Sequence, residues 1–124
     1  MKKPITSHKD LKVWQRSMDL TIEIYTLTKM FPSEEKYGLT SQVRRAAVSV
    51  PSNIAEGVSR KSPKEYINFL YISLASLSEV DTQLIIAERL KYFSNNMSIF
   101  DEIKSIKLMI GALIKAIKKR DSGI

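Results

Sequence analysis

Hydrophobic residues recur along this chain every three or four positions, and hardly anywhere at every second position. The first spacing places side chains on one face of an α-helix, whereas the second is typical of a β-strand. Together with the turn residues between them, the pattern predicts four helices in one all-α domain spanning residues 1–124. The predicted helices cover approximately residues 9–31, 37–58, 63–90 and 98–119.

Residues that favour helix ends support these limits. Ser7 stands three positions before Asp10, as an N-cap serine stands before a first-turn acid, so the first helix is expected to begin after Ser7. Pro32 disfavours helical geometry in the residue before it and is expected to end that helix. Residues 62–65 have the sequence of a capping box with proline at the first helical position.

Pro51 lies inside the second predicted helix and removes the hydrogen bond that the Ala47 carbonyl would accept. We expect a kink there, with Asn53 and Glu56 capping and bracing the broken turn. Gly57 is expected to serve as the C-terminal glycine of this helix.

Short connections between long helices predict an antiparallel, up-down-up-down four-helix bundle. The spacing of 4, 3, 4, 3 in the fourth helix is typical of coiled-coil-like packing, and the second helix has the same spacing. The predicted core positions are Ile99, Ile103, Ile106, Ile110, Leu113 and Ile117 in the fourth helix and Leu39, Val43, Ala46, Val50 and Ile54 in the second.

The first helix carries more hydrophobic surface than a small bundle needs. Large side chains follow two nearly opposite faces, and only one of these faces can enter the core. We expect the other to contact a second chain, because a monomer rarely exposes such a stripe, although a loop or terminus is an alternative cover. One face holds Leu11, Trp14, Met18, Ile22 and Tyr25, and the predicted oligomer interface holds Val13, Leu20, Ile24, Leu27 and Phe31.

The residue inventory argues against an enzyme. Cysteine is absent and His8 is the single histidine, so a thiolate zinc site, a Ser-His-Asp triad and a di-iron bundle site cannot be built. The four glycines are scattered, so no phosphate-binding loop is present, and Gly111 is expected to allow a close contact between helices. We therefore expect no catalytic residues, no metal and no cofactor.

The chain start and the hydrophobic runs predict a cytoplasmic protein without a membrane partner. No hydrophobic leader follows the basic start, and the lack of cysteine gives no sign of an oxidising compartment. The longest run without a polar side chain, residues 108–114, is far shorter than the roughly 20 residues of a transmembrane helix.

The charge favours a polyanionic partner, because 20 lysines and arginines against 13 acids give a net charge of +7. In an antiparallel bundle, the connection between the second and third helices and the end of the fourth helix would share one end and form a basic patch. The candidate nucleic-acid-binding residues are Arg44, Arg45, Arg60, Lys61, Lys64, Lys115, Lys118, Lys119 and Arg120.

The alternative is that these charges are structural. Arg44 and Arg45 would then pair with acids such as Glu79, and the lysines would be a solvated helix end that favours the helix dipole. No aromatic residue is interleaved with the basic residues, so stacking of bases from a single strand is not indicated.

Residues 42–57 read Gln-Val-Arg-Arg-Ala-Ala-Val-Ser-Val-Pro-Ser-Asn-Ile-Ala-Glu-Gly, after Phe-Pro at 31–32 and Glu-x-Tyr-Gly-Leu at 35–39. With Leu-x-Val-Trp-Gln at 11–15 and Leu-Ala-Ser-Leu-Ser-Glu at 74–79, this run resembles the bacterial four-helix-bundle proteins encoded in intervening sequences of large-subunit (23S) ribosomal RNA genes. The resemblance covers nearly the whole chain, although residues 74–76 depart from the usual Ala-Gly-Ser-like stretch.

The resemblance implies an antiparallel four-helix bundle that assembles as a homopentamer. It also implies similarity to the accessory variability protein of diversity-generating retroelements, which binds nucleic acid and a reverse transcriptase. Our leading hypothesis is a non-enzymatic oligomeric bundle, encoded in an rRNA intervening sequence or similar element, that binds RNA or DNA through a basic end. The alternative is a structural or adaptor oligomer that recruits a protein partner such as a reverse transcriptase.

Overall fold

The computed structural model describes residues 7–94 and 96–122 of the 124-residue chain. This part of the chain consists of helices and contains no strand. The α-helices are α1 (Lys12–Thr28), α2 (Leu39–Ser59), α3 (Pro63–Arg89) and α4 (Met97–Ser122), and the 3-10 helices are η1 (His8–Asp10) and η2 (Ser33–Glu35). The predicted all-α class with four helices is confirmed.

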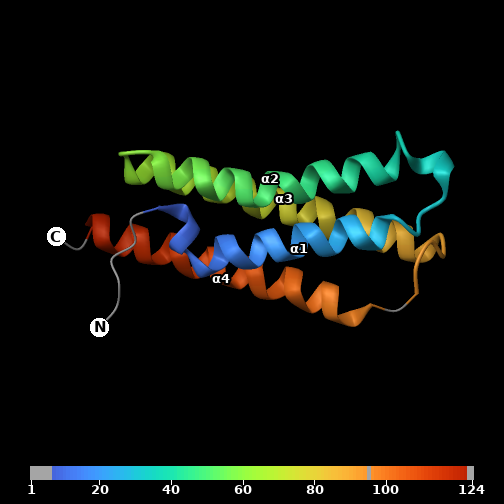
Figure 1. The fold of residues 1–124 in the computed structure, drawn as a ribbon. Coiled ribbons are helices and arrows are strands. Elements are labelled where there is room, and N and C mark those ends of the chain that lie inside the picture. Colours follow the sequence, from blue (N-terminus) through green and yellow to red (C-terminus); the bar gives the residue numbers. More distant parts are fainter. Residues whose placement is uncertain (1–6, 95, 123–124) are drawn as a thin grey trace.

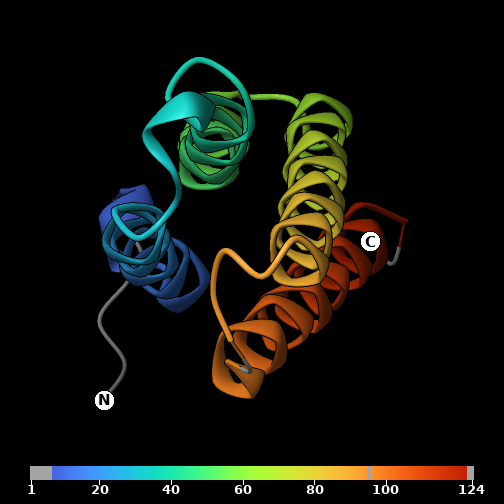
Figure 2. The same cartoon turned by 90° about the vertical axis from the view of Figure 1, so that its right-hand side faces the viewer.

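The four α-helices lie side by side, and each contacts its neighbours in chain order, with α4 returning to α1 (Figure 1). The connections from α1 to α2 and from α3 to α4 lie at one end of the molecule, which faces the viewer in Figure 2. We call this the loop end (residues 29–38 and 90–94). The tight turn from α2 to α3 and the last turns of α4 lie at the opposite end, the turn end (residues 57–66 and 113–121).

The core is formed largely by the positions that the spacing of α2 and α4 predicts. At most 1% of the surface is exposed at Val43, Val50, Ile54, Ile99, Ile103, Ile106 and Ile110. Towards the turn end, Ile114 takes over as the buried residue, while Leu113 and Ile117 only pack against the core from its margin. The last turns of α4 are therefore less covered than the rest of the helix.

The predicted oligomer interface on α1 is wrong, because that face is the one that enters the core of its own bundle. Its five residues, Val13, Leu20, Ile24, Leu27 and Phe31, are all buried within the single chain. The opposite face is the exposed one: Ile22 exposes 63% of its surface, and Met18 and Tyr25 expose 38% each. Small side chains, Ser17 and Thr21, lie beside the buried face and let α1 approach its neighbours.

α1 is shorter than predicted at both ends. Ser7 forms the expected capping box with Asp10, but the turn that it begins is η1, and Leu11 is extended before α1 starts. At the other end, α1 stops at Thr28, and Phe31 lies in the connection that follows. Phe31 remains buried there because its ring packs against aromatic side chains that follow α3.

α2 continues through Pro51 as one helix. The Ala47 carbonyl, which loses its helical donor to the proline, accepts a hydrogen bond of 3.2 Å from the Thr21 hydroxyl of α1. Asn53 braces the turn around Pro51 as expected, because its side-chain amide donates to the Ser49 carbonyl at 2.8 Å and to the Ser49 hydroxyl at 2.9 Å. Glu56 pairs instead with a basic residue after α2, so its expected part in the bracing is wrong, and the donor to the Ala47 carbonyl comes from a neighbouring helix.

α3 lies within one residue of its predicted range, and it is the one helix among the described residues long and hydrophobic enough to cross a membrane. Polar residues interrupt its hydrophobic positions, so it contains no long uninterrupted hydrophobic run. Core helices meet the same criterion, and Leu70, Leu77, Val80 and Leu84 of α3 are completely buried in the bundle. The absence of a membrane partner stays a prediction.

Candidate nucleic-acid interface

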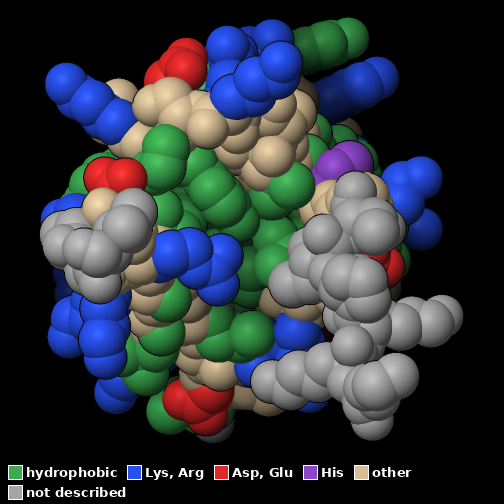
Figure 3. Space-filling view, turned by 90° about the vertical axis from the view of Figure 1, so that its left-hand side faces the viewer, with side chains coloured by type: hydrophobic (Ala, Val, Ile, Leu, Met, Phe, Trp, Pro, Cys, Tyr) green, Lys and Arg blue, Asp and Glu red, His purple; other side chains and the backbone are tan. Residues whose placement is uncertain are grey.

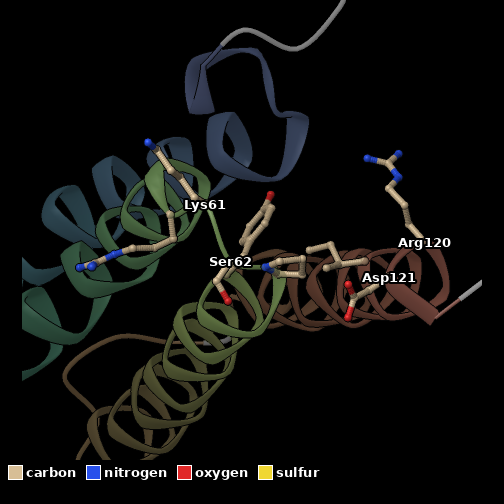
Figure 4. A pocket seen from close by; sticks show the side chains of 8 residues that line it. Lys61, Ser62, Arg120 and Asp121 are labelled. Atoms are coloured by element: carbon tan, nitrogen blue, oxygen red, sulfur yellow. The ribbon is translucent and has the colours of Figure 1, made fainter. Parts of the chain in front are cut away.

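At the turn end, the start of α3 and the last turns of α4 border a cavity of about 340 Å³, which we call the Tyr66 pocket (Figure 4). It brings together residues that are far apart in the sequence, with Arg60 and Lys61 on one side and Arg120 on the other. Its lining consists of Arg60, Lys61, Ser62, Pro63, Tyr66, Ile117, Arg120 and Asp121.

The turn between α2 and α3 is short because both helices have local signals at this point. Arg60 is extended (φ −81°, ψ 144°) and ends α2, and its backbone N–H donates to the Gly57 carbonyl at 3.1 Å. The Ser62 side chain accepts a hydrogen bond from the Glu65 backbone N–H at 3.4 Å, which begins α3 with proline at its first position. The basic residues of the turn are thereby held at the end of the bundle.

Gly57 lies within α2 at negative φ, so the prediction that it is a C-terminal glycine is wrong. Its role is to let α3 approach: a Cβ atom at this position would lie 2.9 Å from the Tyr66 ring and 3.2 Å from Phe69 Cβ. The Tyr66 ring therefore lies directly against the backbone of α2. Burial raises the pKa of the Tyr66 phenol, so the side chain stays neutral at physiological pH.

The guanidinium of Arg60 is held by its surroundings more firmly than the other cations of the turn. It pairs with Glu56 at 3.2 Å and lies 3.8 Å from Glu65, and its guanidinium carbon lies 4.8 Å from the centre of the Phe69 ring. These two carboxylates offset part of its charge. Lys61 and Lys64 are exposed beside it.

Arg44 is not part of this interface. It lies near the start of α2, roughly 24 Å along the helix from Arg60 at 1.5 Å per residue. Its guanidinium donates to the Thr28 hydroxyl at 2.8 Å and to the Tyr25 carbonyl at 3.3 Å, and it stacks on the Tyr25 ring at 4.6 Å. The expected ion pair with Glu79 is also wrong, because Arg44 fastens α2 to α1 through neutral groups.

Arg45 and Glu79 are both exposed. Arg45 lies next to Arg44 in the early part of α2, so it is not part of the interface either.

The basic residues of α4 spread around its last turns. Lys118 points to α3, where its ammonium bonds the Tyr71 hydroxyl at 3.1 Å, whereas Lys115 and Lys119 are exposed. The candidate interface is therefore the basic group Arg60, Lys61, Lys64, Lys115, Lys118, Lys119 and Arg120.

A second cavity, of about 280 Å³, lies next to the Tyr66 pocket and shares Tyr66, Ile117 and Arg120 with it. Its other lining residues are the hydrophobic side chains Leu11, Val58, Leu113 and Ala116. Figure 3 shows the turn end from outside, with hydrophobic side chains in its middle and lysines and arginines around them. The surface is thus a hydrophobic groove with a cationic margin.

Sequence reasoning missed Tyr66 as a site residue, and its statement that no aromatic accompanies the basic residues is corrected by this position. The sequence does contain a signal for it: Tyr66 stands four residues, or one helical turn, after the Ser62 cap, and this spacing places its side chain beside the basic turn.

His8 contacts Trp14, with ring centres 5.0 Å apart, and borders a cavity between α1 and α2. Among the described residues, no group of three or more His, Asp or Glu side chains is arranged to hold a metal ion.

Comparison with known proteins identifies a family and a similar solved structure. The family described as "23S rRNA-intervening sequence protein" matches residues 9–112. A crystal structure of a protein of unknown function from the S23 ribosomal protein family of Bacteroides thetaiotaomicron is similar, with a TM-score of 0.77 and 26% identity. The similarity covers 83% of this chain and 98% of that one. No curated protein matches the sequence significantly.

Proposed function

Because the chain belongs to the 23S rRNA-intervening sequence protein family, we propose that it is a non-enzymatic, oligomeric four-helix bundle that binds nucleic acid through its turn end. The helices alternate in direction, in keeping with the positions of their connections in Figure 1. The observation that carries the proposal is that Lys61 and Arg120, which are far apart in the sequence, line the same cavity. The name of the family refers to 23S rRNA, and RNA is therefore the polyanion that we favour.

Three of the cations at the turn end are available to bind phosphate. Lys61, Lys64 and Arg120 have no ion pair among the described residues, so binding phosphate breaks no ion pair there. Each cation that meets a phosphate releases counterions, which makes the affinity fall steeply with salt. A cytoplasmic protein with a net charge of +7 would meet RNA frequently.

The test is the salt dependence of RNA binding, measured by fluorescence anisotropy. Replacing Lys61, Lys64 and Arg120 with alanine should weaken binding to unrelated RNA sequences alike and reduce the salt slope by about 2. The matched control replaces Lys29, Lys36 and Lys104, which are exposed but lie elsewhere, and should keep the slope of the parent. Equal binding by the two triple variants would refute this interface.

We also propose a homo-oligomer, a cyclic pentamer, in which the exposed stripe of α1 contacts a second copy. Ile22, Met18 and Tyr25 of α1 share a face with Val48 of α2, which is 41% exposed, and a hydrophobic cavity lies between the two helices. Exposed Ile72 and Ile86 of α3 offer a second hydrophobic face for a ring of identical contacts.

Light scattering should then give roughly 70 kDa, five times the chain mass of 14.1 kDa. Ile22→Glu should dissociate the assembly, because it places a charge in the hydrophobic contact, whereas Tyr37→Glu at the loop end should leave the mass unchanged. A monomeric parent protein would exclude the oligomer.

The same exposed stripes support an alternative, an adaptor that recruits a protein partner such as a reverse transcriptase. Hydrophobic recruitment would change little with salt, whereas phosphate binding must weaken. A parent protein that captures such a partner equally at low and high salt, and binds no RNA, would favour the adaptor.

A further inference from the structure

The Tyr66 pocket contains features that binding of phosphate alone does not require. Phosphates need cations on an accessible surface, but this cavity also has the hydrophobic surfaces of Tyr66, Pro63 and Ile117. Its volume of about 340 Å³ falls within the roughly 300–1,000 Å³ of small-molecule sites, so a planar ring can enter it. An aromatic ring beside cations is the arrangement by which proteins bind unpaired bases.

The fold holds the Tyr66 ring in a fixed place. Gly57 lets the ring pack closely against α2, since a Cβ atom at this position would lie only 2.9 Å from the ring. Pro63 in the first turn of α3 borders the same cavity, and Ile117 faces it from α4. The surface offered to a ligand is therefore largely formed before binding, which lowers the entropic cost of association.

We propose that the Tyr66 pocket takes one unpaired base of a single-stranded RNA, stacked on Tyr66, while Lys61 and Arg120 bind the flanking phosphates. This inference rests on the proposed nucleic-acid binding and specifies the class of substrate. A continuous duplex cannot use the pocket, because its bases are stacked on one another and paired. The pocket therefore makes the protein prefer loops, ends and single strands over duplex of the same charge.

Polar groups in the pocket favour a base over an acidic amphipathic peptide or a long-chain carboxylate. The Asp121 carboxylate lies among the lining residues, where it repels another carboxylate. It can accept hydrogen bonds from the exocyclic amino group of a base, as acidic side chains do from cytosine. The Ser62 hydroxyl adds a further polar group at the edge of the cavity.

The experiment compares three RNA probes at one salt concentration: a single strand of about 12 cytidines, a strand of equal length with abasic sites, and a duplex of equal length. The parent protein should bind the cytidine strand about tenfold more tightly than the abasic strand. Tyr66→Leu should lose this difference while it binds the abasic strand as the parent does. Tyr37→Leu, the control, changes a tyrosine that is 88% exposed at the loop end and should keep the difference.

A second measurement uses the unmodified protein, so that it does not depend on the folding of Tyr66→Leu. A single strand that carries 5-iodouridine should cross-link under ultraviolet light to Tyr66, as identified by mass spectrometry. Cross-linking only to residues outside the pocket would overturn the inference.

The remaining outcomes separate the two proposals. Equal affinity of the parent for the cytidine, abasic and duplex probes would overturn the base pocket and leave phosphate binding intact. Failure to bind any of the three would refute the proposed function itself. Displacement of the cytidine strand by an acidic amphipathic peptide, with no effect of removing the bases, would assign the groove to a protein partner and overturn the inference.

Discussion

The loop end and the turn end close the same four helices in different ways. At the loop end, Phe31 stacks on Phe93 with ring centres 6.3 Å apart, both rings are buried, and the Tyr92 hydroxyl donates to Glu35 at 2.7 Å. At the turn end, Tyr66 borders an open cavity with cations at its margin. The difference indicates that the loop end stabilises the fold, whereas the turn end leaves surface available for a ligand.

Removing one aromatic ring from each end tests whether the two ends differ in their contribution to stability. Phe31→Ala should lower the free energy of unfolding by about 3–5 kcal/mol, because it leaves a cavity in the core. Tyr66→Ala should cost less than half of that, because the ring is only partly buried. Urea unfolding of both variants measures the two values, and equal losses would show that the turn end is as structural as the loop end.

A pair of glycines tests how tightly the turn end is built. Gly57→Ala should lower stability by about 1–3 kcal/mol, since the new methyl group meets the Tyr66 ring, and it should also weaken RNA binding. Gly111→Ala should instead raise stability by about 0.5–1 kcal/mol, because no atom lies within 4 Å of a Cβ there and alanine favours a helix. Thermal unfolding distinguishes the signs, and a stabilised Gly57→Ala would contradict this packing.

The smallest expected effect is a pH dependence at the loop end. The hydrogen bond from Tyr92, together with one from the Leu39 backbone N–H, lowers the pKa of Glu35. Glu35 therefore stabilises the fold above its unfolded pKa of about 4.3, and this contribution is lost as the pH falls through its lower folded value. Tyr92→Phe should melt below the parent at neutral pH and approach it in acid. A difference independent of pH would show that the bond does not favour the ionised form.

Much of the fold could be predicted because helices depend on local spacing. The residues 62–65 fixed the start of α3, and the isoleucine spacing of α4 identified four completely buried positions. Spacing could not decide which hydrophobic face of α1 enters the core, since both faces are rich in large residues. The structure places Ser17 and Thr21 on the buried side, where each donates to a carbonyl of its own helix and allows a close contact. The prediction for Gly111 failed as well, because no neighbouring atom approaches it closely.

The candidate site was predictable only as far as topology determines it. Lys61 and Arg120 come together because the second connection and the end of α4 share one end of the bundle. Arg44 was predicted to bind nucleic acid, or alternatively to pair with an acid, because charge is visible in a sequence, whereas its actual partners include a backbone carbonyl and an aromatic ring. The place of Tyr66 depends on the missing side chain at Gly57, a contact between two helices that no local pattern reveals.

NMR can locate the RNA-binding site directly on the backbone of the protein. Titration of the labelled protein with a single-stranded RNA should shift amide signals of residues 57–66 and 115–121 and leave those of residues 31–39 unchanged. The triple variant of Lys61, Lys64 and Arg120 should lose these shifts while its spectrum stays folded. Shifts centred on the loop end, or spread equally over both ends, would contradict a binding site at the turn end.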